Sequence, residues 1–277
     1  MAHNVDARGN LITLAYNDLG MAVSAGRIAG VKSLNKFGRS TNVDSSEDTD
    51  IWDRANATHD QAIWVAPTAA RQHSIVSASD ADSDTGGVKA QGAGARTLRI
   101  YGLTSWTSKE VSEDVVMDGT QAFNTSNSYV IIHRMKVLTK GATVGANVGL
   151  ITATAASDGT ITAQINAGQG QTQMAIYGVP SVQKLYLVSF YAVSNRAAGP
   201  SGLVDITLKV NPEPDVERTG FLTKHTTSIS SGTLPSIFHT FVVPKTISGP
   251  CIIKIQGNAS ANDFDVSAGF DGMLIDN

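Results

Sequence analysis

Three aspartates at alternate positions, Asp80, Asp82 and Asp84 in "SDADSDTGG", have the types and spacing closest to a metal site. Carboxylates at such spacing occur in calcium-binding loops. An EF-hand loop starting at Asp80 would need glycine at its sixth position and glutamate at its twelfth, where this chain has Thr85 and Gln91. We therefore expect a solvated loop here and no metal.

A second acidic group lies in the polar stretch "STNVDSSEDTDIWDR", residues 40–54. Its members are Asp44, Glu47, Asp48, Asp50 and Asp53. We expect these side chains to be solvated, with a bound cation or a basic partner surface as the alternative.

The stretch "GAGARTLRIYGL", residues 92–103, begins with glycines beside an arginine, which is a combination that can cradle phosphate. A phosphate-binding loop needs its glycines after a strand and at the start of a helix, so that backbone N–H groups face the anion. Here Gly92 and Gly94 lead into residues that alternate like a strand, and no GK[ST] follows. The glycines therefore predict a turn into a strand.

None of the six histidines falls into HExxH or another metal-ligand spacing. His133 lies on the mostly apolar face of a predicted strand, which favours a core imidazole with satisfied hydrogen bonds. His225 and His239 lie on candidate neighbouring strands and could approach each other. A metal site there would need further ligands that the sequence does not indicate.

No catalytic constellation stands out. The chain has no GxSxG, and no Ser, His and Asp set can be selected. Paired carboxylates distant in sequence, as in glycoside hydrolases, stay an open alternative. The single cysteine, Cys251, lies in the apolar run "CIIKI" and is expected to be a buried, inert thiol. We expect no catalytic residue, no cofactor, no metal and no enzymatic activity.

The overall composition excludes some partners. Charged residues make up 16% of the 277 residues and the net charge is −3, whereas typical soluble domains carry about 25% charged residues. No basic block indicates nucleic acid, and no run approaches the roughly 18 apolar residues of a membrane helix. The N-terminus lacks a signal-peptide pattern. We expect a cytoplasmic product that binds neither nucleic acid nor membrane.

Residues 1–70 differ from the rest of the chain. Gly20, Gly26 and Gly30 each disfavour a helix by about 1 kcal/mol relative to alanine. We expect an extended N-terminal arm whose bulky apolar side chains are buried by a neighbouring subunit. The residues expected to make these partner contacts are Phe37, Ile51, Trp52, Ile63 and Trp64.

Beyond the arm, the sequence predicts strands. Residues 129–137 and 204–210 alternate between apolar and polar side chains with a period of two. The segment "LYLVSFYAV", residues 185–193, is apolar on both faces, as expected for a strand buried between layers. Residues 212–214, with two prolines, mark a connection because proline cannot donate within a ladder.

Two Asp-Gly pairs predict tight turns between paired strands. They are Asp158-Gly159 in "ITATAASDGTITAQI" and Asp118-Gly119 in "VVMDGTQAF". Such pairs suit the positive φ angles of hairpin turns.

These signals predict an all-β fold of the antiparallel β-sandwich or jelly-roll type. The strand-rich part is longer than one minimal sandwich, so we expect two small β-domains in tandem. The expected division is an extended arm over residues 1–70, a β-sandwich over residues 71–178 and a second sandwich or jelly-roll over residues 179–277.

Five segments resemble a family of tailed-bacteriophage virion proteins. "SLNKFGRSTNVDSSEDTDIWD" resembles that family's INKFGRN-x-DID-x-EDIWD pattern, and "GAGARTLRIYGLTSWTSKEVSEDVVMDGT" is similar to its GTGART and LNGT stretch. "HRMKVLTKGATVGANVGLITA", "INAGQGQTQMAIYGVP" and "NDFDVSAGFDGMLID" also fit, in order along the chain. The chain departs from the family at "GLTSW", where the family has GLD, at "VMDGT", where it has LNGT, and over residues 54–73.

The resemblance implies a structural component of a tailed-phage virion, because its motifs are strand and turn signatures. We expect a capsid decoration or cement protein that stabilises the shell through contacts with the major capsid protein and other virion proteins. A homo-oligomer, with a trimer favoured, is expected in the virion, after synthesis in the host cytoplasm. A tail, neck or baseplate component is the alternative within this class.

A glycan-binding module for host attachment is an alternative of a different class. Trp106, in the loop "GLTSWTSKE", would then be a stacking residue. The competing interpretation is that Trp106 packs against the arm or a neighbouring subunit, since interface cores are enriched in tryptophan.

Overall fold

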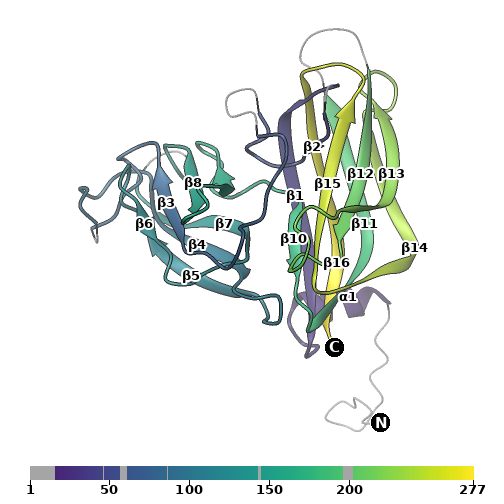
Figure 1. Ribbon diagram of the computed structural model, residues 1–277, viewed down its shortest axis with the longest axis horizontal. Coiled ribbons are helices and arrows are strands. Elements are labelled where there is room, and N and C mark those ends of the chain that lie inside the picture. Colours follow the sequence, from purple (N-terminus) through teal and green to yellow (C-terminus); the bar gives the residue numbers. More distant parts are fainter. Residues whose placement is uncertain (1–15, 46, 57–60, 86, 143–144, 196–201) are drawn as a thin grey trace.

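The computed structural model describes residues 16–277 except 46, 57–60, 86, 143–144 and 196–201. Antiparallel β-sheet accounts for nearly all its regular structure, so the all-β prediction is confirmed (Figure 1). A helix, α1 (Tyr16–Ser24), precedes the first strand, β1 (Val31–Val43), although its sequence includes Gly20. The described part of the chain contains no helix long and apolar enough to cross a bilayer.

The remaining strands follow in chain order. They are β2 (Thr49–Asp50), β3 (His73–Ser77), β4 (Ala95–Leu103), β5 (Val111–Val116), β6 (Phe123–Asn124), β7 (Ile131–Lys140), β8 (Ile151–Ala155), β9 (Ile161–Ile165), β10 (Ile176–Val179), β11 (Gln183–Asn195), β12 (Leu203–Asn211), β13 (Leu222–Ser230), β14 (Ser236–Ser248), β15 (Cys251–Ala259) and β16 (Phe264–Asp276).

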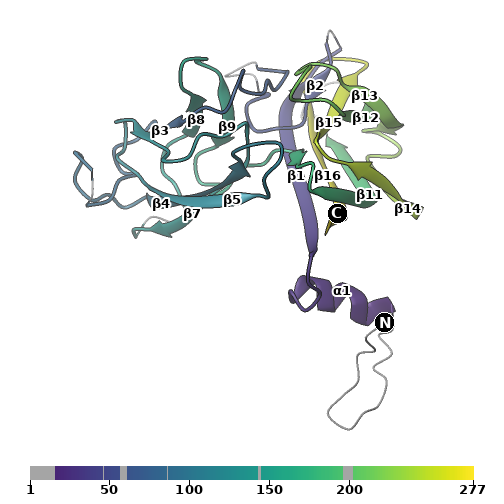
Figure 2. The same ribbon diagram turned by 60° about the horizontal axis from the view of Figure 1, so that its bottom comes forward.

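One unit of the molecule is a sandwich-like pair of sheets formed by residues 31–51 and 175–277, here called the sandwich unit. Its β1 sheet has the strand order β1-β16-β11-β14, and its β15 sheet has the order β10-β15-β12-β13 with β2 beside β15. The two sheets face each other in Figure 2. They enclose one apolar core, to which the alternating side chains of residues 204–210 contribute as predicted.

Residues 52–174 form a second unit, here called the inserted unit. It contains the sheets β6-β3-β8-β9 and β5-β4-β7 around a second apolar core. The predicted hairpin at Asp158-Gly159 joins β8 to β9, and Gly159 has the expected positive φ of 67°. Gly92 and Gly94 precede β4, which confirms that they form a turn into a strand.

Two adjacent chain segments, here called the neck, connect the two units, and Ile176 and Ile252 of the sandwich unit also pack into the second core. The chain leaves the sandwich unit at Ile51 and Trp52 and returns at Met174 and Ala175. Trp52 and Met174 form an antiparallel bridge, and the N–H of Ala175 donates to the oxygen of Ile51 over 2.9 Å. Gly38 of β1 lies against both neck segments.

The expected division into an arm and two tandem domains is therefore replaced by an insertion. β1 is not an arm that reaches a neighbouring subunit, because it pairs with β16 of its own chain from Val31↔Ile275 to Val43↔Phe264. The expected boundary after residue 178 falls inside β10. Local patterns could not show this pairing, since the partner strands are separated by more than 200 residues.

Two strand predictions also need correction. The pair Asp118-Gly119 does not close a hairpin, because β5 and β6 on either side of it belong to different sheets. Strand β11 is not buried between layers on both faces. Its outer side chains, Tyr186, Tyr191 and Val193, remain partly or largely exposed.

Replacing Gly38 with alanine should destabilise the fold. A Cβ atom there would lie 2.2 Å from the oxygen of Ile51 and 2.4 Å from the nitrogen of Ala175. These are backbone atoms that cannot rotate away, so we expect a loss of about 1–3 kcal/mol or more. Urea unfolding would measure this loss.

The control is Gly20→Ala in α1, where a Cβ would meet no atom within 4 Å. This change should be neutral or stabilising, by up to about 1 kcal/mol. Equal unfolding midpoints for Gly38→Ala and the wild type would contradict the close packing at the neck.

Candidate functional site

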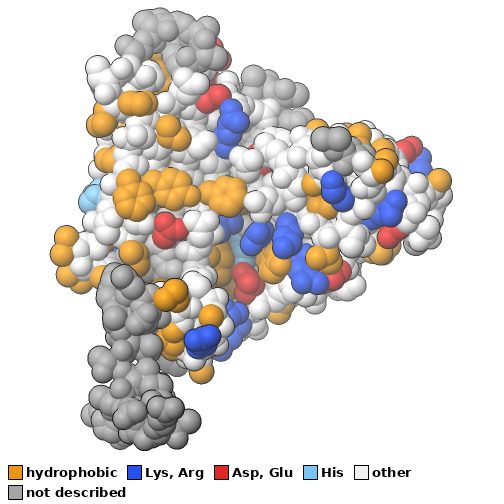
Figure 3. All heavy atoms as spheres, turned by 180° about the vertical axis from the view of Figure 1, so that it is seen from behind, with side chains coloured by type: hydrophobic (Ala, Val, Ile, Leu, Met, Phe, Trp, Pro, Cys, Tyr) orange, Lys and Arg blue, Asp and Glu red, His pale blue; other side chains and the backbone are white. Residues whose placement is uncertain are grey.

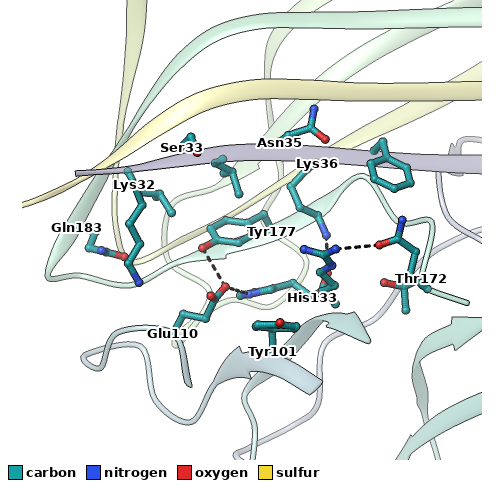
Figure 4. Close-up of a pocket in the computed structure, with 15 residues that line it drawn as sticks. Lys32, Ser33, Asn35, Lys36, Tyr101, Glu110, His133, Thr172, Tyr177 and Gln183 are labelled. Atoms are coloured by element: carbon teal, nitrogen blue, oxygen red, sulfur yellow. Dashed lines mark hydrogen bonds and ion pairs between the residues drawn. The ribbon is translucent and has the colours of Figure 1, made fainter. Parts of the chain in front are cut away.

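A cavity of about 300 Å³ lies between β1 and the inserted unit (Figure 4). Strands from both units line it, and all five segments that carry the virion resemblance contribute. Its polar and charged lining residues are Lys32, Ser33, Asn35, Lys36, Tyr101, Glu110, His133, Arg134, Gln171, Thr172, Tyr177 and Gln183. Figure 3 shows Lys and Arg side chains gathered where the two units meet.

Glu110, His133 and Tyr177 form a hydrogen-bonded group at one side of the cavity (Figure 4). Nε2 of His133 lies 2.5 Å from Oε2 of Glu110, and the Tyr177 hydroxyl donates to the same oxygen over 3.4 Å. The rings of His133 and Tyr177 stack with centroids 4.2 Å apart. His133 is thus a buried imidazole in a polar cluster, and its Nδ1 has no partner among the described residues.

Burial and mutual contact set the protonation of this group. Burial lowers the pKa of His133, against the opposing effect of Glu110, so the imidazole is neutral and donates through Nε2. Burial alone would raise the pKa of Glu110, but the hydrogen bond from His133, together with the charges of Lys32 and Lys36, outweighs burial and the pKa is lowered. Burial, with the charge of Glu110, raises the pKa of Tyr177. Glu110 is therefore the acceptor of the group.

Lys36 is the deepest cation of the cavity, with 7% of its surface exposed. Its ammonium donates to the backbone oxygen of His133, and no carboxylate among the described residues forms an ion pair with it. Burial and, to a smaller extent, the charge of Arg134 lower its pKa to about 7, while the charge of Glu110 opposes the shift. Lys36 and Arg134 therefore line one cavity, in which Lys36 is buried and Arg134 is exposed.

Arg134 is held by neutral partners. Its Nη2 donates to Oε1 of Gln171 over 2.9 Å, and its guanidinium lies 5.6 Å from the centroid of the Tyr101 ring. Lys32 lies on the same face of β1 as Lys36, and its charge also lowers the pKa of Glu110. The cavity thus has three cations and one carboxylate, and that carboxylate is already hydrogen-bonded to two groups.

The outer face of the β1 sheet carries a second candidate surface. Strand register places Phe37, Gly269, Tyr191 and Phe238 side by side across β1, β16, β11 and β14. We call Phe37, Tyr191 and Phe238 the aromatic row. Phe238 is 68% exposed, and Figure 3 shows hydrophobic side chains in a line across this face.

Gly269 shapes the aromatic row. A Cβ on Gly269 would lie 2.4 Å from the hydroxyl oxygen of Tyr191, so the tyrosine ring reaches over the glycine. Next to it, Asn35 donates to Asp271 over 2.6 Å, and Ser189 donates to the same carboxylate over 3.1 Å. An apolar row therefore lies beside a row of hydrogen-bonding groups.

Three of the five arm residues predicted to contact a partner are buried in this chain. Ile51, Trp52 and Trp64 have relative exposures of 0%, 0% and 2%, so the prediction that a neighbouring subunit buries them is wrong. The indole N–H of Trp52 donates to Gln61 and that of Trp64 donates to Thr162. These groups anchor the neck to the inserted unit.

The other predicted contact residues lie at the surface. Phe37 belongs to the aromatic row, and Ile63 is 39% exposed beside a shallow cavity. Trp106 is partly buried, because its ring packs against Gly178 of its own chain and its backbone oxygen accepts from Ser181 over 2.7 Å. Part of the Trp106 ring is therefore covered by its own chain.

The aspartates at alternate positions form a structural hub. Asp82 is fully buried and accepts hydrogen bonds of 2.7–2.8 Å from the side chain of Ser77 and the backbones of Ala95, Val148 and Gly149. The prediction of a solvated loop is therefore wrong for Asp82. It holds together three loops of the inserted unit.

The acidic group in residues 44–53 also includes buried carboxylates. Asp50 forms a buried 2.8 Å ion pair with Lys254. Asp53 is 4% exposed and accepts from the backbone of Gln173. Both lie inside the molecule, against the expectation that the cluster is solvated. No group of three potential metal-ligating side chains occurs among the residues that the structure describes.

The two histidines of β13 and β14 do approach each other. The ring centroids of His225 and His239 are 4.5 Å apart, beside Phe190 and Phe241 at the open edge of the sandwich unit. Cys251 is buried as predicted, and burial raises the pKa of its thiol to about 12.

Comparison with known proteins gives no family for this chain, since no family model matches it and no curated protein matches it.

Sequence reasoning missed both candidate surfaces. The cavity is lined by residues from five segments that are distant in the sequence, and the spacing of residues within one segment cannot predict that the segments lie together. The sequence did contain a signal for the aromatic row. Strand β11 is apolar on both faces, but in a pair of stacked sheets only one face of each strand lies against the core, so the apolar side chains of the other face remain at the surface.

Substituting Lys36 by methionine should change how stability depends on pH. Between pH 7 and 10.5 the unfolded lysine takes up a proton that the folded lysine, with its pKa of about 7, does not. The wild type therefore loses stability as pH falls through this window, by up to about 1.4 kcal/mol per unit. Lys36→Met should lack this slope and be the more stable protein at pH 7.

Urea unfolding at pH values between 7 and 10 measures the slope. Leu34→Met, on the same face of β1, introduces the same side chain without removing a titratable group. Its free energy of unfolding should depend on pH as that of the wild type does. Parallel curves for Lys36→Met and the wild type would show that the amine is not desolvated.

Proposed function

We propose that the protein is a structural component of a tailed-phage virion, with capsid decoration or cement as its role and the outer face of the β1 sheet as its contact surface. The observation that carries the proposal is the aromatic row. Large apolar side chains at the centre of an exposed sheet are the kind of residue on which subunit contacts depend.

The motifs of the resemblance agree with a structural role. Gly38 of "NKFG" packs against the neck. A Cβ atom on Gly94 would lie 2.1 Å from Oδ1 of Asp82, so this position has no room for a side chain. Phe37 of the same motif belongs to the contact face. The two glycines allow close packing within the fold, and Phe37 lies on its outer face.

The contact face replaces the arm as the predicted means of attachment. It is formed by a rigid four-stranded sheet, so little conformational entropy is lost when a partner binds. Major capsid protein, other virion proteins and further copies of this chain, with a trimer as the favoured assembly, are the proposed partners.

Truncating the aromatic row should reduce incorporation into particles. Phe37→Ala, Tyr191→Ala and Phe238→Ala together should lower the copies per particle to less than about a tenth, since central aromatic anchors dominate interface energies. Quantitative mass spectrometry of purified particles against the major capsid protein would measure this.

Val88→Ala and Val216→Ala are the controls, because both valines are more than three-quarters exposed and lie off this face. The triple variant should stay folded, and unchanged incorporation would contradict the proposed contact face. Wild-type copy number also separates the two locations: hundreds of copies indicate the shell, and a small multiple of three indicates tail, neck or baseplate.

A glycan-binding module is the second candidate, now based on Tyr191 in place of Trp106. The observation that favours it is the Tyr191 ring over Gly269 beside Asn35 and Asp271. Aromatic rings stack on the apolar faces of sugars, while carboxylate and amide groups bind hydroxyls.

If the face binds glycans, the isolated protein should sediment with insoluble chitin, cellulose or peptidoglycan. Tyr191→Ala should abolish this binding by removing the stacking ring, whereas Trp106→Ala should retain it. Co-sedimentation that survives Tyr191→Ala, or none with any of the three polymers, would exclude the glycan role for this face.

A further inference from the structure

We infer that the cavity between β1 and the inserted unit is a binding site for a small organic oxyanion, a carboxylate or a phosphate monoester. This inference does not depend on the virion role. It follows from which charged groups line the cavity and from how each of them is already engaged.

The cations of the cavity lack an anionic partner. Among the described residues, Lys32, Lys36 and Arg134 form no ion pair. An ammonium has three protons to donate and a guanidinium has five. Among the described residues, Lys36 and Arg134 contact one backbone oxygen, one amide oxygen and one aromatic ring.

One carboxylate lines the cavity beside these three cations. Glu110 accepts from His133 and Tyr177 on its Oε2 atom, and its charge raises the pKa of Lys36, but it forms no ion pair with Lys36 or Arg134. The charge of Arg134 lowers the pKa of Lys36, so the two cations repel each other, and both line the cavity that a bound oxyanion would occupy. Bringing an anion between two cations turns this repulsion into two attractions in a partly desolvated site.

The cavity also has room and surfaces for an organic group. Its volume is about 300 Å³, and Leu34, Tyr101 and Leu274 contribute apolar walls next to the cations. A single phosphate or carboxylate would occupy only part of this space. An aromatic or short aliphatic group attached to the oxyanion would cover the apolar walls.

The site lies where its occupancy can affect the whole molecule. Lys32 and Lys36 come from β1 of the sandwich unit, whereas Arg134 comes from β7 of the inserted unit. An anion that binds all three would link the units beside the neck. Binding should therefore stabilise the folded protein by an amount that increases with ligand concentration.

Titration calorimetry and thermal unfolding of the full chain test the inference with inorganic phosphate, phenyl phosphate and benzoate, and with benzyl alcohol as a neutral analogue. We expect saturable binding of one oxyanion per chain, a rise in Tm and no effect of benzyl alcohol. Binding of the phosphates alone or of benzoate alone identifies which oxyanion the site takes.

Lys36→Met and Arg134→Gln should each weaken binding by about tenfold, because each removes one charge-assisted contact. Arg99→Gln is the matched control, since Arg99 lies on the neighbouring strand β4, is paired with Asp114 and does not line the cavity. It should bind like the wild type.

Folding defects do not obscure this comparison, because Arg134 is exposed and Lys36→Met is expected to stabilise the protein. The inference is overturned if none of the three anions binds saturably. It is equally overturned if both cavity variants bind as tightly as Arg99→Gln.

Discussion

The pairing of β1 with β16 joins the beginning and the end of the described chain, from Val31 beside Ile275 to Val43 beside Phe264. With β1 in place, the β1 sheet is complete and its inner face closes over the core of the sandwich unit. The same strand forms one wall of the polar cavity through Lys32 and Lys36, and it supplies Phe37 to the outer face. Neither candidate surface would exist if β1 extended toward another subunit.

The local elements could be predicted from the sequence, but their assembly could not. Alternation over residues 204–210 and the Asp158-Gly159 turn are short-range signals that the fold keeps, because a half-buried strand and a positive φ impose their own residue types. The role of Trp52 was misjudged for the opposite reason. The segment around it has no core of its own, and the residues that bury it come from an inserted unit whose position no local pattern reports.

Charged residues were the least predictable. Asp82 and Asp50 were both expected in solvent, but each is buried with hydrogen-bond donors that come from elsewhere in the chain. A buried carboxylate is tolerated only when such donors surround it. The sequence shows the carboxylate but not the donors that the fold brings to it. It therefore cannot distinguish a buried, hydrogen-bonded aspartate from an aspartate in a solvated loop. Lys36 differs from these aspartates, because it is a buried cation and its ammonium has only one hydrogen-bond acceptor among the described residues.

The neck has a consequence for how such a molecule can vary. Trp52 and Met174 are bridged neighbours, so the two ends of the inserted unit leave the sandwich unit side by side. Adjacent ends are the geometry at which one module can be inserted into another. Ile176 of β10 and Ile252 of β15 are buried against the inserted unit, so a different module would have to cover them, and it would also replace one wall of the cavity.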